Sequence, residues 1–293
     1  MAWSLIGVTG DLAQRAQEIK EIPPLPHVAQ ALLQLKSDPA ADAKALSKLV
    51  QLDPSLASQM MRYANSAFFA YRGKIDSIQD AVSRVLGFDR ALHIAVGLSA
   101  GKSLRHSQQG PLGVDAFWRH AVYSATLMQA LAQASGVRKQ ISPGMVYLAG
   151  LVHDIGHLLL GYLLEAEFTA LNKAVADQPG RPVVDIESEL LGVTHDEMGV
   201  WVLRKWKLPT EVLVAVMHHH NDDYHGEYAS YAHLTALADE ILFAVEQRTE
   251  ARLSPMLLAN LGLTEDQSLQ IANELLTQRD GLESLVQQVL KVA

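Results

Sequence analysis

The most informative part of the chain is the stretch Leu148-Ala149-Gly150-Leu151-Val152-His153-Asp154-Ile155-Gly156-His157-Leu158-Leu159-Leu160. It has helical length and is apolar on nearly every side, and a helix of that kind is normally buried inside a larger body. It nevertheless carries an imidazole and a carboxylate side by side, at His153 and Asp154. Burying an ionised carboxylate is costly unless the charge is paired or bound to a metal. The sequence therefore predicts a compensating cation beside Asp154, either a proton on His153 or a metal ion.

Helix-start signals recur along the rest of the chain. Asp53-Pro54, Ser142-Pro143 and Ser254-Pro255 each place a capping side chain before a proline at the first helical position. Thr194–Glu197 and Thr264–Gln267 have the spacing of a capping box. We find no convincing alternation of apolar and polar residues and no Asn-Gly or Asp-Gly hairpin signal. These signals predict an all-α fold of ten or more short helices, arranged as two packed lobes.

The composition excludes several classes of protein. The 293 residues carry a net charge of -8, are 49% hydrophobic and include no cysteine. The acidic balance argues against general nucleic-acid binding, and the lack of cysteine excludes disulfides and thiolate metal sites. The N-terminus does not resemble a secretory signal, and no stretch approaches the roughly 20 apolar residues that span a bilayer. We therefore expect a cytoplasmic protein that does not contact membranes.

Composition along the chain suggests four segments. The polar stretch Ser103–Gly113, which contains glycine and proline, is the predicted seam between two helical lobes. The predicted segments are an N-terminal extension, a first helical lobe, a second lobe and C-terminal helices, at residues 1–18, 19–110, 111–245 and 246–293. The C-terminal helices are expected to pack on the second lobe or to mediate a homodimer.

Metal-capable side chains gather in the predicted second lobe. A buried His-Asp pair with another histidine upstream and an aspartate downstream suits one divalent ion of iron, manganese or zinc. The predicted ligands are His120, His153, Asp154 and Asp239. Each has an ordinary alternative, because a single histidine on an apolar face is more often a hydrogen-bonded core residue. His195 could equally be an exposed first-turn residue, and the run from His218 to His220 a solvated helix end.

In order and approximate spacing, His120, His153-Asp154 and Asp239 resemble the H…HD…D signature of the HD superfamily of metal-dependent phosphohydrolases. The extended form, residues 153–156, resembles the start of the motif in the HD-GYP branch, which cleaves cyclic dinucleotides. That resemblance implies a second metal site formed by His195 with His218 or His219. Two departures argue against cyclic di-GMP hydrolysis: His157 stands where the branch has lysine, and the Gly-Tyr-Pro element is missing.

Motifs in the first lobe and around the second-site histidines narrow the resemblance. Together they are similar to the HDOD domain, the HD-related output domain of bacterial signalling proteins, from about Ile19 to Asp239. The motifs are Ile22–Pro26, Leu52–Leu56, Met61–Ala67, Ile75–Ala81, Leu191–His195, Trp206–Pro209 and His218-His219. Many members of that family are regarded as regulatory modules that have lost metal ligands, whereas this chain keeps an unusually full set.

Three functions follow from these observations. The leading expectation is a regulatory output module that retains a metal site and binds an unidentified signalling protein. The second is a metal-dependent phosphohydrolase acting on a nucleotide or another phosphoester, with Asp154 and His195 as catalytic residues. In that case a bound metal would lower the pKa of the water that attacks phosphorus. The third is a metal or redox sensor. Catalyst and sensor need the same buried ligands, so the sequence does not choose between them.

Overall fold

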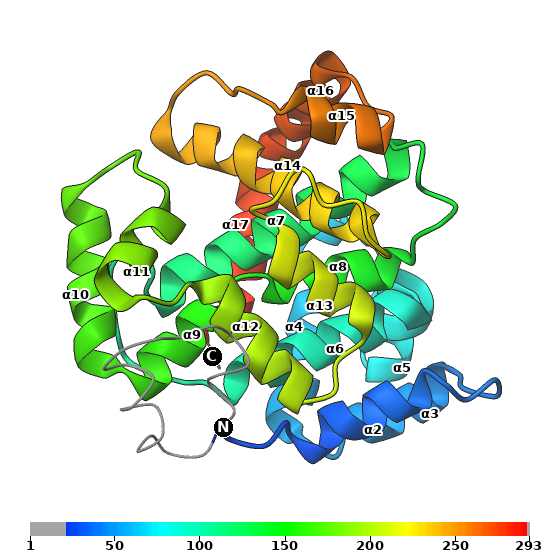
Figure 1. The fold of residues 1–293 in the computed structure, drawn as a ribbon. Helices are drawn as coiled ribbons and strands as arrows, with labels where there is room; N and C mark the ends of the chain where they lie inside the picture. Colours follow the sequence, from blue (N-terminus) through cyan, green and yellow to red (C-terminus); the bar gives the residue numbers. More distant parts are fainter. Residues whose placement is uncertain (1–21, 292–293) are drawn as a thin grey trace.

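The computed structural model describes residues 22–291, and these residues form helices and loops without any strand (Figure 1). The predicted all-α fold of two packed helical lobes is confirmed. The predicted N-terminal extension, residues 1–18, lies outside the described residues. The residues predicted to cap helices do so. The side chains of Asp53, Ser142 and Ser254 accept backbone hydrogen bonds from the first turns of the following helices, and capping boxes form at Thr194 and Thr264.

The first lobe is built from short helices around the longer helix α6. Its elements are α2 (His27–Leu35), α3 (Ala43–Val50), α4 (Pro54–Ala64), η2 (Ala67–Phe69), α5 (Ile78–Asp80), η3 (Ala81–Leu86) and α6 (Phe88–Lys102). Asp53 caps α4 and also binds the amino group of Lys102 at 3.0 Å, which ties the start of α4 to the end of α6. Almost the whole length of α6 is buried because it packs against the second lobe as well as the first.

The second lobe surrounds a central helix pair, α8 and α9. Its elements are α7 (Val114–Ala134), α8 (Pro143–Val152), α9 (Ile155–Leu163), α10 (Glu165–Asp177), α11 (Val183–Leu191), α12 (His195–Lys205), α13 (Thr210–His218) and α14 (Ala229–Gln247). Helix α8 contacts both α6 and α7, and α9 contacts α12. The predicted seam, Ser103–Gly113, connects α6 to α7, but the apolar core runs across both lobes without interruption.

The apolar stretch Leu148–Leu160 is not one continuous helix. The sequence suggested one continuous helix, but α8 ends at Val152 and α9 begins at Ile155, with His153 and Asp154 in the turn between them. Asp154 has φ −96° and ψ 15°, outside the helical range. The break turns the Asp154 side chain out of the core, so that 18% of it is exposed, whereas His153 stays fully buried. The carboxylate therefore faces a cavity and is not enclosed by apolar groups.

Helices α8 and α9 together pass a length-and-composition test for a membrane span. The stretch Pro143–Leu163 has a mean hydropathy of 1.3, but 83% of the tested window is buried inside the protein. A core helix pair of this kind meets the same criterion without any membrane.

The C-terminal helices pack on both lobes. They are α15 (Pro255–Leu261), α16 (Glu265–Thr277) and α17 (Arg279–Leu290). Helix α15 contacts α14, α16 contacts α7, and α17 contacts α7 together with α4 and η2 of the first lobe. On α17, Glu283 binds the guanidinium of Arg119 at 3.0 Å and accepts the hydroxyl of Tyr123 at 2.9 Å. The expected packing on the second lobe is thus observed, and α17 extends it to the first.

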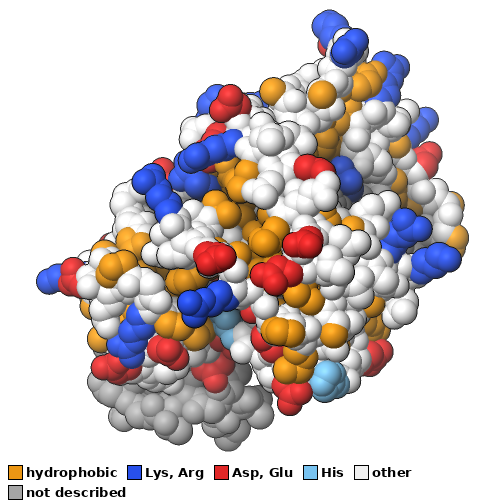
Figure 2. Space-filling view, turned by 90° about the horizontal axis from the view of Figure 1, so that it is seen from above, with side chains coloured by type: hydrophobic (Ala, Val, Ile, Leu, Met, Phe, Trp, Pro, Cys, Tyr) orange, Lys and Arg blue, Asp and Glu red, His pale blue; other side chains and the backbone are white. Residues whose placement is uncertain are grey.

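The surface carries charges of both signs. Figure 2 shows basic and acidic side chains interspersed on one face, with apolar side chains between them. The absence of general nucleic-acid binding, the homodimer and the signalling partner stay predictions.

Candidate metal centre

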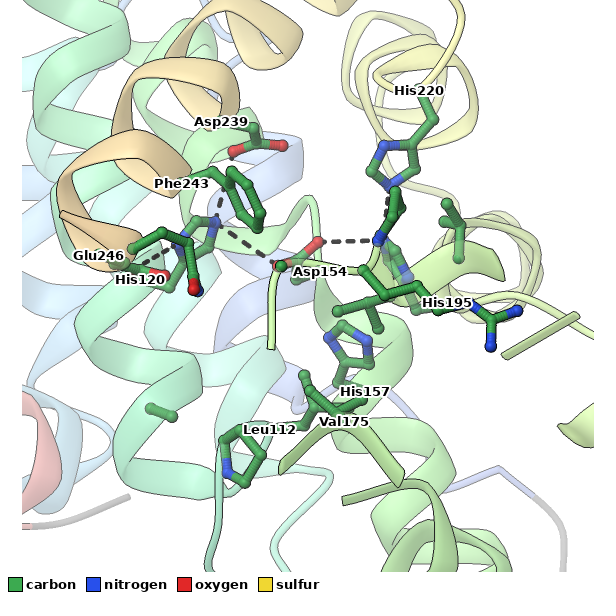
Figure 3. Close-up of a pocket in the computed structure, with 18 of the residues that line it drawn as sticks. Leu112, His120, Asp154, His157, Val175, His195, His220, Asp239, Phe243 and Glu246 are labelled. Atoms are coloured by element: carbon green, nitrogen blue, oxygen red, sulfur yellow. Dashed lines mark hydrogen bonds and ion pairs between the residues drawn. The ribbon is translucent and has the colours of Figure 1, made fainter. Parts of the chain in front are cut away.

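Helices α7, α12 and α14, the α8–α9 turn and the segment after α13 bring histidine and aspartate side chains to one point in the second lobe (Figure 3). His120 comes from α7, the pair His153-Asp154 from the α8–α9 turn, and Asp239 from α14. His195 is the first residue of α12, and His219 and His220 follow the last residue of α13. Ligand groups supplied by separate helices are the usual way in which an all-helical protein builds a metal site.

The first cluster contains the four residues predicted as ligands. The Nε2 atom of His120 lies 3.2 Å from Nε2 of His153 and 3.3 Å from Oδ1 of Asp239. The Nε2 atom of His153 lies 3.4 Å from that same oxygen. Oδ2 of Asp154 completes the group, at 3.4 Å from His153 and 3.7 Å from His120.

The second cluster lies on the other side of Asp154. The Oδ1 atom of Asp154 lies 3.2 Å from Nε2 of His195 and 3.7 Å from Nε2 of His219. The Nε2 atom of His195 lies 3.3 Å from that of His219 and 3.1 Å from that of His220. One carboxylate therefore faces both clusters, with one oxygen directed to each.

Among the second-site candidates, His195 and His219 are brought together, but His218 is not. The ring of His218 stacks on Tyr224, with centroids 3.8 Å apart and planes 9° from parallel. His220, which the sequence reasoning did not select, stands in the cluster instead. Helical spacing could have indicated it, because His220 follows the buried Val216 by four residues, one turn further along.

Backbone carbonyls orient two of the imidazoles. Nδ1 of His153 lies 2.9 Å from the carbonyl oxygen of Gly150, and Nδ1 of His219 lies 2.8 Å from that of Val216. A carbonyl oxygen only accepts hydrogen bonds, so Nδ1 must donate in both residues. In the neutral rings the free electron pair is then on Nε2, and this nitrogen points into the clusters. This tautomer is the one that can bind a metal through Nε2.

A buried glutamate that the sequence analysis missed orients His195. Glu187 on α11 is fully buried. Its Oε2 accepts the backbone N–H of His195 at 3.0 Å and lies 2.8 Å from Nδ1 of that ring. Its other oxygen lies 2.8 Å from Nε2 of His157. The signal was the position of Glu187 next to Ile186 and one turn before Leu191, both of which are buried.

A close approach of two helices holds the second cluster in register. At Gly156 in α9, a Cβ atom would lie only 1.8 Å from the carbonyl oxygen of His195 in α12. Glycine is therefore required at this position for α12 to sit against α9. The Ile155-Gly156 pair thus has a packing role beside the Asp154 carboxylate.

The carboxylates and imidazoles of the site shift each other's pKa values. Burial alone would raise the pKa of Asp154, but His153 and His195 outweigh it and hold the pKa well below its usual range. Burial alone would also raise the pKa of Asp239, but His153 and His120 outweigh it and lower that pKa. Conversely, burial alone would lower the pKa of His120, but Asp239 and its acidic neighbours raise it. The site therefore holds its carboxylates ionised and attracts cations, either protons or metal ions.

The donor set fits a divalent transition metal. Atoms that share an ion at about 2.1 Å are separated from one another by about 3.0–3.4 Å, close to the spacings in both clusters. Oδ1 of Asp239 is buried and accepts no hydrogen bond of normal geometry, although two imidazole nitrogens lie within 3.4 Å. A cation would satisfy this oxygen. Imidazole with carboxylate is the ligand combination for iron, manganese and zinc.

The clusters open into a cavity of about 830 Å³. His120, Asp154, His195 and Asp239 form one part of its wall (Figure 3). Other parts of the wall come from the segment before α7, from the α10–α11 connection and from the second half of α14. A substrate-sized molecule can therefore reach the candidate ligands.

Comparison with known proteins identifies the family. Residues 22–222 match the HDOD domain. The chain belongs to the HDOD family. This confirms the resemblance found in the sequence.

Solved structures of several bacterial proteins are similar to this HDOD protein. A candidate signal transduction protein of Marinobacter aquaeolei VT8 is 31% identical, with a TM-score of 0.83 over 92% of this chain and 60% of that one. An HDOD domain protein of unknown function from Geobacter sulfurreducens is 21% identical, with a TM-score of 0.77 and 98% of each chain covered. A candidate phosphohydrolase from Shewanella amazonensis SB2B is 24% identical, with a TM-score of 0.73 over 95% and 97% of the two chains. The last two likenesses concern the fold alone.

A curated relative, an uncharacterized protein of Treponema pallidum (strain Nichols), is 24% identical over 209 residues. This stretch is 71% of this chain and 39% of the relative. The chain thus spans less than two thirds of both the Treponema and the Marinobacter proteins.

Proposed function

We propose that this HDOD protein is a metal-dependent phosphohydrolase whose centre holds two divalent ions. One observation carries the proposal: the two oxygens of Asp154 face two separate groups of imidazole nitrogens, 3.2–3.7 Å away. A carboxylate between two sets of nitrogen ligands is the arrangement expected of a two-metal site. His120, His153 and Asp239 would hold one ion, and His195, His219 and His220 the other.

The charge of the cavity supports a role for metal ions in substrate binding. Its wall carries carboxylates from Asp154, Asp222, Asp239 and Glu246 and guanidinium groups from Arg119 and Arg181. It also carries Glu240, whose pKa burial raises to about 7. An anionic phosphoester would be repelled by this excess of negative charge. Two divalent ions would offset it, so substrate binding should depend on metal loading.

When bound, divalent ions supply Lewis acidity toward water and the phosphoryl oxygens. The protein residues fix the geometry. Asp154 would space the two sites, and Glu187 holds the ring of His195. Glu187 also engages Nε2 of His157, which lines the cavity beside the second cluster.

A signalling role is the second candidate, and it is compatible with catalysis. It is supported by the HDOD family itself and by the Marinobacter relative, a candidate signal transduction protein that is similar over 92% of this chain. In this form of the proposal, a partner protein would sense or control the state of the metal centre.

The test uses protein purified without a histidine tag or chelator. Metal content is measured by elemental analysis, and hydrolysis of 4-nitrophenyl phosphate and bis(4-nitrophenyl) phosphate is followed after loading with manganese, iron or zinc. We expect metal-dependent hydrolysis that Asp154→Ala reduces by about 100-fold or more. Asp115→Asn, an exposed carboxylate on α7 outside the cavity, serves as the control and should retain activity. A loaded protein that hydrolyses neither ester, or an Asp154→Ala variant that remains active, would contradict the proposal.

A further inference from the structure

An exposed aromatic ring lies beside the candidate ligands. Phe243 follows Asp239 by one helical turn on α14, lines the cavity and is 43% exposed (Figure 3). Residues four apart lie on the same face of a helix, so the ring and the Asp239 carboxylate face the same space. A large apolar side chain that remains exposed inside a cavity is a typical feature of a binding site.

The other parts of the cavity wall continue this apolar surface. Leu112 comes from the segment before α7, Val175 from the end of α10, and Val183 from the start of α11. Three separate elements thus supply aliphatic side chains to the same cavity as Phe243. A molecule bound at the histidine and aspartate clusters would have its remaining atoms among these groups.

The cationic groups of the cavity are already engaged. Among the described residues that line it, the only Arg or Lys side chains are Arg119 and Arg181. The N–H groups of Nε and Nη2 of Arg119 donate hydrogen bonds to the Glu283 carboxylate at 3.0–3.3 Å. Arg181 donates to Gln178 at 2.8 Å and to Glu189 at 2.5 Å.

The cavity wall also carries carboxyl groups that are not candidate ligands. They belong to Asp222 and Glu246, and to Glu240, which is only partly ionised at neutral pH because burial raises its pKa to about 7. Consequently, a second phosphate group far from the metal ions would meet carboxylates and no free cation in the described wall.

We propose that the substrate is a phosphoester with a single phosphate whose alcohol portion is apolar and planar and packs against Phe243. The inference rests on the proposed function for its chemistry. Water oxygen forms the new bond to phosphorus, the bond from phosphorus to the alcohol oxygen breaks, and the alcohol leaves with a proton from that water. The apolar wall selects the alcohol, because burying a ring stabilises the complex through the area removed from water.

Binding of phosphonates tests the inference without turnover, because their P–C bond is not hydrolysed. Calorimetry on the metal-loaded protein compares phenylphosphonate with methylphosphonate. We expect phenylphosphonate to bind about tenfold more tightly or better. Phe243→Ala should remove most of that difference. Val245→Ala is the matched control, since Val245 is exposed on the same helix but does not line the cavity, and it should keep the difference.

Hydrolysis separates failure of this inference from failure of the proposed function. Phenyl phosphate and diphenyl phosphate are compared with glycerol 2-phosphate, and the two phenyl esters also distinguish monoesters from diesters. If glycerol 2-phosphate has an equal or higher kcat/KM, the inference is wrong and the phosphohydrolase remains. If no ester is hydrolysed but phenylphosphonate is preferred, the phosphohydrolase is wrong and the apolar pocket remains. Equal affinities for the two phosphonates, a preference that survives Phe243→Ala, or no binding of either overturns the inference.

Discussion

Glu187 binds His195 at two points through one carboxylate oxygen. This oxygen accepts the backbone N–H of His195 at 3.0 Å and lies 2.8 Å from ring atom Nδ1. Burial alone would raise the pKa of Glu187, but His195 and His157 outweigh it, so the carboxylate stays ionised. An ionised carboxylate only accepts hydrogen bonds, which makes Nδ1 the donor. The Nε2 atom of His195 is thereby directed at Asp154.

Glu187→Gln should weaken the second metal cluster selectively. The amide keeps the shape but loses the charge that holds the His195 ring, and losses of about 10–100-fold in metal affinity are typical of such changes. We expect the affinity of one ion to fall by that factor and the other to change little, measured by competition with a chromophoric chelator. Asp185→Asn, exposed on the same helix, is the control. Unchanged affinity for both ions in Glu187→Gln would show that Glu187 does not position the ligand.

Metal stoichiometry should depend on which carboxylate is removed. Asp154 faces both clusters, whereas Asp239 contributes to the first cluster alone. Elemental analysis of the native protein should therefore give about two ions, Asp239→Ala about one, and Asp154→Ala close to none. Asp154→Ala should also lower Tm, because bound metal stabilises the folded state. A native protein that carries no metal and takes none up, together with a tolerated Asp154→Asn, would leave only a metal-free regulatory module.

Substitution of His218 and of His220, which flank His219, should affect metal binding differently. His220 lies 3.1 Å from His195 in the second cluster, whereas His218 stacks on Tyr224. His220→Ala is expected to lower the affinity of one ion by about tenfold or more, and His218→Ala to leave both affinities unchanged. The same chelator competition measures both variants. The reverse result would return His218 to the ligand set that the sequence suggested.

The Asp89 carboxylate should make stability depend on acid pH. Burial alone would raise the pKa of Asp89, but hydrogen bonds involving His93, Gly144 and Ser142 lower it from 3.8 to about 2. A group whose pKa is lower in the folded state adds stability above about pH 4 and loses it as the pH falls toward 2. The side chain is half exposed, so we expect about 1 kcal/mol after solvent screening.

Urea unfolding of the native protein and of Asp89→Asn at several pH values measures this contribution. The difference in free energy of unfolding should be full at pH 7 and about halved near pH 3. A difference that stays constant over this range would contradict the assignment to ionised Asp89.

Local chemistry made much of the fold predictable. Ser142-Pro143 and Asp53-Pro54 mark helix starts because the capping side chain and the proline act within one turn. The break at His153-Asp154 was not predictable in this way, since neither residue is a glycine or proline and the apolar run continues on both sides. It depends on tertiary contacts, among them the approach of α12 to Gly156.

The candidate site was predictable only in part for a related reason. His120, His153, Asp154 and Asp239 were selected by order and spacing, together with the HD resemblance. Glu187 could not be selected from spacing, because its partners His157 and His195, 30 and 8 positions away, are brought to it only by folding. His220 could have been suggested by spacing, because it follows the buried Val216 of α13 by four residues.

The contacts of helix α17 with both lobes affect how the protein unfolds. It lies against α4 and η2 on one side and against α7, which carries His120, on the other, with Glu283 bound to Arg119 and Tyr123. Neither lobe can melt without uncovering apolar surface of this shared helix. The two lobes should therefore unfold in one cooperative step, and the ligand-bearing helix should keep its shape until the whole protein loses it.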